Sequence, residues 1–517
     1  MALKTKALRN VGSNWFGLAT NLVVGFLLSP FILHRLGDDA FGLWVLVFSL
    51  TGYYGLFDFG IRSSIVRYVA QFKATGEKDS LNRFINTSLC TYGGTGLLLL
   101  MLTVGASFYV DSLFKIPAAL QWNARMLFLI VGTAVAVGFP LSVFAGVLEG
   151  LQKFNWLSLT QAGYNVARAV LIVIALRRGG GLLTIALISM ILSLATYAVY
   201  FAVVQRELAV RYALRYVDRE SFRKMLSYGS ITFVATIASQ LRFYSDATVI
   251  GIFIGSAAIT YFSIGSKLVS YSSNVTQSMA QIFTPMSSQF NATGEIERLR
   301  QILVRGNRAC ALIVFPLCAT LIILGKSVIE VWVGAKYVPI AYTVLVLLVV
   351  SDSAQMAQSA SGKILYGMAR HRTLAFVWLA EGVVNLVLSI VLLRYYGVIG
   401  VAIGTTIPQL CTNLFFLPEH LCRVLGIRLR TFVSQTYIAP ALLCAPLVAV
   451  LLLMRHFFVA HTYLELLAQV AAGGAVYSVG LLWLLLKKEQ MGPELRRLMR
   501  FRQPAMEAAN VASGIQG

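Results

Sequence analysis

The sequence is dominated by long apolar runs that are separated by short polar connections. Fourteen runs of about 20 residues can be counted, at approximately 11–34, 40–61, 84–110, 126–148, 156–176, 182–205, 226–254, 257–287, 309–325, 338–362, 373–393, 398–418, 434–454 and 464–486. At a rise of about 1.5 Å per residue, a helix of this length crosses the hydrocarbon core of a bilayer. We therefore expect an all-α polytopic membrane protein with about 14 transmembrane helices.

The few charges of the chain are placed as membrane topology requires. Only 12% of the residues are charged and 58% are hydrophobic, whereas a soluble domain carries about twice as many charges. The net charge of +22 would suit a protein that binds nucleic acid, but Lys and Arg cluster in the connections between apolar runs. We expect membrane lipids, and no nucleic acid, among its partners.

The basic residues also predict an orientation. The tails and connections on the side of both termini contain 31 Lys and Arg, the other side contains 9, and three lie inside apolar runs. Because basic loops stay in the cytoplasm, we expect both termini to be cytoplasmic, in a bacterial inner membrane. The first apolar run shows no cleavage pattern, so it is predicted to be a retained helix rather than a signal peptide.

An internal repeat is visible at an offset of 217 residues. The matches are Gly12-Ser13 with Gly229-Ser230, Leu148 and Gly150 with Leu365 and Gly367, and Gly180 with Gly397. An even number of helices per unit makes two parallel six-helix lobes around a central cavity, an arrangement of alternating-access carriers. The expected segments are an N-terminal lobe 1–205, a basic cytoplasmic linker 206–225, a C-terminal lobe 226–425, two extra helices in 426–487, and a basic tail 488–517.

Three cations fall inside predicted membrane helices: Arg168, Arg242 and Lys267. A charged side chain at that depth costs on the order of 3 kcal/mol, so it usually faces a cavity or a partner. Three such cations would together bind a phosphate or pyrophosphate group. We predict that all three bind substrate, and that Arg242 faces the central cavity.

Four acids also lie within or near the membrane helices: Asp58, Asp246, Asp352 and Glu381. Acids at this depth either relay ions or pair with nearby cations, so a coupling role and a structural role both stay open. Asp246 follows Arg242 by four residues, which places the two on one helical face. We expect Asp246 to orient Arg242.

Nothing in the sequence indicates catalysis. The six cysteines form no CxxC pair and the five histidines form no HExxH motif, so neither a disulfide framework nor a metal site is expected. No P-loop, no nucleophile elbow and no long extramembrane loop is present. We expect no cofactor and no enzymatic activity. The basic segment Lys487–Arg502 is predicted to lie on anionic lipid headgroups.

Several motifs occur in an ordered series along residues 10–430. They are Asn14-Trp15, Pro30-Phe31, Leu36-Gly37, Phe41-Gly42-Leu43-Trp44, Leu56-Phe57-Asp58-Phe59-Gly60, Arg67-Tyr68-Val69, Leu148-Glu149-Gly150-Leu151-Gln152, Arg242 with Asp246, Tyr261 with Lys267, Val331-Trp332-Val333-Gly334 with Tyr337, and Leu365 and Gly367 with Arg370. In this order they resemble the polysaccharide transporter (Wzx-type flippase) family of the multidrug/oligosaccharidyl-lipid/polysaccharide exporter superfamily.

The resemblance implies two lobes that form a V around a cationic cavity. It implies transport of a polyprenyl-diphosphate-linked oligosaccharide for surface polysaccharide or exopolysaccharide synthesis, such as O-antigen or lipopolysaccharide, with a polysaccharide polymerase or export machinery as a further partner. Many members of this branch have twelve helices. A related peptidoglycan-precursor flippase family has two extra helices, which form a lipid-facing groove.

Two alternative functions are open. A cation-coupled multidrug exporter of the same superfamily would be expected to carry an acid in its first helix, and residues 11–34 contain none. A membrane polysaccharide polymerase or ligase would need a large extracytoplasmic loop, and the longest such loop, near 110–125, is short.

Overall fold

The computed structural model describes residues 2–370 and 372–487, and these residues form helices and no strands. The first part of the chain contains α1 (Ala2–Leu36), α2 (Asp38–Gly52), η1 (Tyr53–Asp58), α3 (Ile61–Thr75), α4 (Lys78–Ser107), α5 (Val110–Leu113), η2 (Ala118–Leu120), α6 (Gln121–Gly150), α7 (Phe154–Arg177), α8 (Leu182–Leu208) and η3 (Leu214–Tyr216). The predicted basic tail, 488–517, lies outside the described residues.

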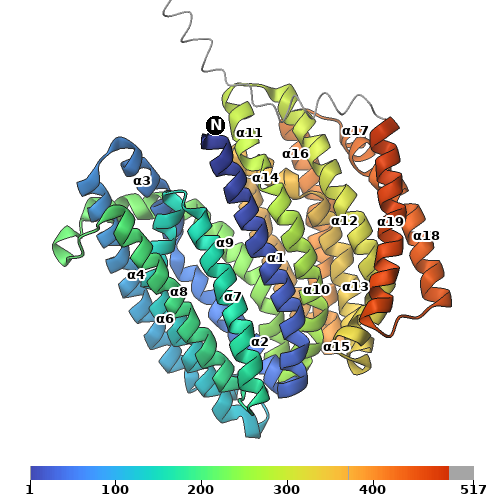
Figure 1. Cartoon of the computed structure of the whole chain (residues 1–517), viewed down its shortest axis with the longest axis horizontal. Coiled ribbons are helices and arrows are strands. Elements are labelled where there is room, and N and C mark those ends of the chain that lie inside the picture. Colours follow the sequence, from blue (N-terminus) through green and yellow to red (C-terminus); the bar gives the residue numbers. More distant parts are fainter. Residues whose placement is uncertain (1, 371, 488–517) are drawn as a thin grey trace, which may run out of the picture.

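The second part also consists of helices and lies beside the first (Figure 1). It contains α9 (Arg219–Phe253), α10 (Ser256–Ala280), α11 (Phe283–Ala292), α12 (Ile296–Val333), η4 (Ala335–Tyr337), α13 (Val338–Ala357), α14 (Ser359–Gly367), α15 (Arg372–Leu410), η5 (Cys411–Phe416), α16 (Leu417–Leu425), α17 (Leu429–Val433), η6 (Ser434–Ile438), α18 (Ala439–Phe457) and α19 (Tyr463–Lys487). The expected all-α membrane architecture is confirmed.

The predicted count of fourteen spans is not confirmed. Eleven helical segments within the described residues are long and apolar enough to cross a membrane. The polar helices α9 and α10 are not among them, and Arg372–Leu425 counts as one segment. That segment nevertheless changes direction at Gly397, which has φ 56° and ψ −135°.

The two arms on either side of Gly397 lie side by side. A Cβ atom at Gly404 would lie 2.6 Å from the backbone nitrogen of Ser389, and one at Gly400 would lie 2.2 Å from the carbonyl oxygen of Leu392. Residues further apart in sequence are therefore paired across the turn, as in a helical hairpin. Gly397 permits this turn because a residue without Cβ adopts a positive φ at low cost.

The turns recur within one residue of the offset that the sequence repeat predicts, and the turn glycine that matches Gly397 is Gly179 rather than the predicted Gly180. Five residues with positive φ in the first half have a counterpart 217 or 218 positions later; the pairs are Gly37 and Gly255, Gly76 and Gly294, Gln152 and Ala369, Gly179 and Gly397, and Ala209 and Gly426. Side-chain contacts recur as well. Thr75 donates a hydrogen bond to Glu77 at 2.8 Å, and Thr293 donates one to Glu295 at 2.7 Å.

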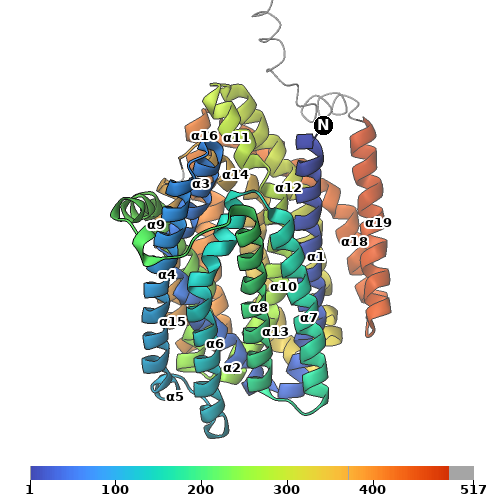
Figure 2. The same ribbon diagram turned by 60° about the vertical axis from the view of Figure 1, so that its left-hand side comes forward.

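The helices α18 and α19 form an appendage at one edge of the molecule (Figures 1 and 2). They pack on α12 through a small apolar cluster that includes Leu324, Leu447 and Leu451. The Tyr477 hydroxyl also donates a hydrogen bond to the carbonyl oxygen of Leu312 at 2.5 Å. Within the described residues, these contacts attach the appendage to the second half through α12.

The segment between α8 and α9 is fixed against the first half. Asn86 and Thr87 of α4 make hydrogen bonds with the backbone of Arg211, Ala213 and Asp218. The Asp218 carboxylate caps α9 by accepting from the Ser221 backbone N–H at 2.8 Å. Partial burial would raise the pKa of Asp218, but the hydrogen bonds from Ser221 favour the charged form and lower it overall.

Candidate functional site

The motif Phe41-Gly42-Leu43-Trp44 brings α2 against α10. A Cβ atom at Gly42 would lie 1.8 Å from the carbonyl oxygen of Ser256, so only glycine allows this approach. Phe41 and Trp44, three residues apart, occupy one face of α2 and are buried. Each of these two rings lies beneath a cation from another helix.

Arg168 of α7 and Lys267 of α10 are these cations. The Arg168 guanidinium carbon lies 5.8 Å from the centre of the Trp44 ring, and the Lys267 ammonium lies 4.4 Å from the centre of the Phe41 ring. Because Phe41 and Trp44 lie on one face of α2, the two cations above their rings lie near each other. The structure thus brings together two of the three predicted cations, one from each half of the chain.

Neither of these two cations has an acidic partner among the residues that the structure describes. Arg168 Nε donates to the Ser189 hydroxyl at 3.1 Å, and Lys267 Nζ lies 3.5 Å from the Ser29 hydroxyl. Both cations are half-buried. Cations that are held by hydroxyls and aromatic rings, with no carboxylate to neutralise them, are free to bind an anion.

Arg242 of α9 lies in a different environment. Its guanidinium contacts Asp352 of α13 at 3.6 Å and Glu381 of α15 at 3.5 Å. It also donates to the side-chain oxygen of Gln355, and Gln409 donates to Asp352. Two carboxylates thus already neutralise Arg242, unlike Arg168 and Lys267, and its role in substrate binding stays a prediction.

No ion pair joins Asp246 to Arg242 among the described side chains, so the orienting role of Asp246 stays a prediction. The ion pairs of Arg242 among the described side chains go to Asp352 and Glu381, from other helices. The Asp246 carboxylate accepts from the Thr405 hydroxyl at 3.1 Å, and that hydroxyl lies 3.3 Å from the Asn385 side-chain oxygen. Four-residue spacing put the two charges on one face, but α13 and α15 supplied better-placed acids.

Asp58 lies at the end of η1 and makes other contacts. It accepts a hydrogen bond from the Tyr92 hydroxyl and another from the Arg62 backbone N–H at 3.4 Å. Arg62 in turn forms an ion pair with Glu149 at 2.6 Å. These contacts join η1, α3, α4 and α6 within the first half, and they favour a structural role for Asp58.

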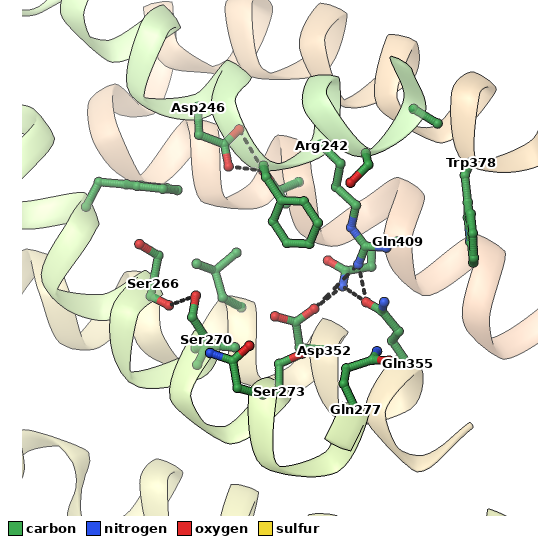
Figure 3. A pocket seen from close by; sticks show the side chains of 18 of the residues that line it. Arg242, Asp246, Ser266, Ser270, Ser273, Gln277, Asp352, Gln355, Trp378 and Gln409 are labelled. Atoms are coloured by element: carbon green, nitrogen blue, oxygen red, sulfur yellow. Dashed lines mark hydrogen bonds and ion pairs between the residues drawn. The ribbon is translucent and has the colours of Figure 1, made fainter. Parts of the chain in front are cut away.

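Beside the Arg242 cluster lies a cavity of about 770 Å³. Its walls come from α9, α10, α13, α14 and α15, and Figure 3 shows the cluster between Trp378 and a row of serines on α10. Arg242, Asp246 and Asp352 all line this cavity. The sequence analysis placed these residues at membrane depth but overlooked the polar wall of α10, whose signal was the helical spacing of Ser266, Ser270 and Ser273.

The two halves are joined at the end of the molecule where α1 ends and α2 begins. Lys336 lies 3.0 Å from Asp38, the Tyr337 hydroxyl donates to Asp38 at 2.5 Å, and the Ser256 hydroxyl donates to Asp39 at 2.6 Å. The sequence reasoning missed these acids. Their position directly after Gly37, between two apolar runs, was the available signal.

A further contact at this joined end comes from Trp332, whose indole N–H donates to the carbonyl oxygen of Phe26 at 2.7 Å. The N-terminus of α1 lies at the opposite end, together with α3, α11 and α16 (Figures 1 and 2). The described contacts therefore hold α1 and α2 against α10, α12 and η4 at one end.

Comparison with known proteins gives a consistent picture. Residues 7–291 match the family described as "Polysaccharide biosynthesis protein". The chain is 22% identical over 440 residues to "Uncharacterized membrane protein EpsK" of Bacillus subtilis (strain 168), a match that covers 82% of this chain and 85% of that protein. It is 21% identical over 434 residues to the "Putative O-antigen transporter" of Shigella flexneri, covering 81% and 99%.

Solved structures share the fold. An inward-facing multidrug resistance MATE transporter of the MOP superfamily matches with a TM-score of 0.68 at 15% identity, covering 79% of this chain and 95% of that one. The lipid II flippase MurJ, in an inward closed conformation, matches with a TM-score of 0.67 at 16% identity, covering 90% and 96%. At these identities the likeness concerns the fold alone.

Proposed function

This chain belongs to the polysaccharide biosynthesis protein family, and from this premise we propose that it flips a polyprenyl-diphosphate-linked oligosaccharide across the cytoplasmic membrane. The polar head of such a lipid cannot cross hydrocarbon unaided, because burying its charges and hydroxyls without partners costs far more than thermal energy. A polar path through a two-lobed carrier replaces the lost hydration. The chain acts as a transporter rather than as an enzyme.

The pair of Arg168 and Lys267 is the observation that carries this proposal. Their cationic groups come from the two halves of the chain, and no described carboxylate neutralises them. A diphosphate supplies the missing negative charge and enough oxygens to contact both side chains. When the halves move apart, this shared site would be broken, which would release the cargo on the other side.

The direction of access follows from the joined end. With both termini in the cytoplasm, as the distribution of basic residues favours, the contacts of Asp38 and Asp39 lie on the extracytoplasmic side. The conformation would then be closed to the outside. Labelling tests this orientation: Ser112→Cys should react with an impermeant maleimide from outside and Lys78→Cys only after lysis, with Cys90 and Cys411 replaced by Ser.

The function is tested by reconstituting the purified protein into vesicles that contain a fluorescent polyprenyl-diphosphate-linked oligosaccharide. We expect the labelled head to become accessible to a membrane-impermeant quencher faster than in protein-free vesicles. Arg168→Ala should slow this exchange, whereas Arg178→Ala, an exposed position at the end of the same helix, should not. Exchange at the protein-free rate would contradict the proposal. Export of ethidium instead would favour the multidrug alternative.

A further inference from the structure

The cavity beside Arg242 has the chemistry of a site for carbohydrate, and no property described above assigns it a ligand. We propose that it is a subsite that binds a neutral or amino sugar of the cargo, next to the diphosphate site but separate from it. This inference rests on the proposed function. The volume of about 770 Å³ lies within the range of about 300–1,000 Å³ that is typical of ligand pockets, which leaves room for a fragment of an oligosaccharide.

The polar wall of the cavity suits hydroxyl groups. Ser266, Ser270, Ser273 and Gln277 of α10 line it, and their spacing places them along one face of the helix. Hydroxyl and amide side chains both donate and accept hydrogen bonds, as sugar hydroxyls do. Asn274, also in the lining, is exposed and adds a second amide.

Two aromatic rings supply the apolar part of the site. Phe243 lines the cavity and is 68% exposed, although a ring at this depth would normally be packed against other side chains. Trp378 lies beside the Arg242 cluster, away from the serine row (Figure 3). The C–H face of a pyranose ring packs well on an aromatic ring because both surfaces are apolar.

The charges of the cavity select against anions. Arg242 is already bound by Asp352 and Glu381, and Asp246 adds another carboxylate to the lining. Three acids thus face one cation, so a phosphate or a uronic acid would be repelled while a neutral or amino sugar would not. The diphosphate is left to Arg168 and Lys267.

The two sites are neighbours along α10. Ser266 lines the cavity, and the next residue, Lys267, lies over Phe41 at the boundary with α2. Consecutive residues of a helix point in different directions, so a sugar that is joined directly to a diphosphate would have to contact two adjoining faces of α10 to occupy both sites. With two sites, the protein would recognise the sugar separately from the diphosphate that all such lipids share.

Saturation-transfer NMR on the full-length protein in lipid nanodiscs tests the subsite. The probes are the methyl glycosides of N-acetylglucosamine, glucosamine and glucuronic acid, and inorganic pyrophosphate is followed by phosphorus NMR. Phe243→Ala and Asn274→Ala should each weaken binding of the first two glycosides about three- to tenfold and leave pyrophosphate binding intact. Phe376→Ala, which removes an exposed ring of α15 outside the cavity, should change neither.

Arg168→Ala should give the opposite pattern, with pyrophosphate binding lost and glycoside binding kept. Glycoside binding that neither cavity variant weakens, a glucuronide that binds as tightly as the neutral glycoside, or pyrophosphate binding without any glycoside signal would each overturn the subsite alone. If the unchanged protein binds neither pyrophosphate nor any glycoside, the proposed function fails together with the subsite.

Discussion

Arg242 and Asp246 of α9 stand 217 residues after Gly25 and Ser29 of α1, the offset of the sequence repeat and within one residue of the register that the turns at Gly37 and Gly255 set. In α1 these positions carry no charge: Gly25 is in close contact with Tyr271, since a Cβ atom there would lie 3.1 Å from the Tyr271 hydroxyl, and the Ser29 hydroxyl lies 3.5 Å from Lys267 Nζ. In α9 they carry charge toward α13 and α15. The same position in the repeat therefore holds uncharged residues beside Lys267 in α1 and charged residues in α9.

This difference teaches where a repeat is constrained and where it is free. The turns recur because each requires a residue with positive φ at the end of a helix. The residues within α1 and α9 differ because the two helices contact different neighbouring helices. The cation pair requires both halves, and so does the joined end. We therefore expect perturbations across the two halves to have larger effects than perturbations within one.

The largest effect is expected from fixing the halves together. In Asp39→Cys/Ser256→Cys, a short bis-thiosulfonate reagent should bridge the two positions, because the native side chains are in hydrogen-bond contact at 2.6 Å. Flipping in the vesicle assay should fall to the protein-free rate and return after reduction. Each single variant, treated in the same way, is the control. Full activity of the bridged protein would show that the joined end need not open.

The next largest effect is expected at the cation pair. Arg168→Ala and Lys267→Ala should each lower the flipping rate about 10- to 100-fold, since a charge-assisted hydrogen bond is worth about 1.5–3 kcal/mol. Arg168→Lys and Lys267→Arg should recover part of the rate because the charge is kept. Equal flipping rates for these alanine variants and for the Arg178→Ala control would contradict the proposed anion site.

Within one half, Arg242→Ala should act on stability. It leaves the carboxylates of Asp352 and Glu381 without their cation, and breaking a buried ion pair from one side costs about 3 kcal/mol. Thermal unfolding in detergent should show a lower midpoint, which Asp352→Asn and Glu381→Gln in the same chain should largely restore. Arg394→Ala, an exposed change on α15, is the matched control. An unchanged unfolding midpoint for Arg242→Ala would contradict the claim that the ion pairs of Arg242 stabilise the protein.

The smallest effects are expected at the repeated turns, and they should be equal in the two halves. Gln152→Gly and Ala369→Gly should each stabilise the protein by about 1 kcal/mol, because both residues have a positive φ that disfavours a Cβ atom. Gly76→Ala and Gly294→Ala should each destabilise it by a similar amount. No atom lies within 4 Å of the added Cβ at either position, so the change in stability reports the backbone conformation alone. Unequal shifts in unfolding midpoint would show that the turns are not equivalent.

The sequence by itself determined the helical class, the membrane environment and the repeat. Apolar length, loop charge and a constant offset are local or additive properties, so they can be read without knowing which helices touch. The sequence also identified Arg168, Arg242 and Lys267 as residues that need partners, because a charge at membrane depth is costly wherever it points.

Only the tertiary structure decided which partners those residues have. Asp246 was the natural partner of Arg242 by spacing, yet Asp352 and Glu381 reach it from helices more than 100 residues away. Trp44 and Phe41 lie under Arg168 and Lys267 because Gly42 lets α2 approach α10. Such contacts depend on the rotation and separation of whole helices, which hydrophobic periodicity within one helix does not specify.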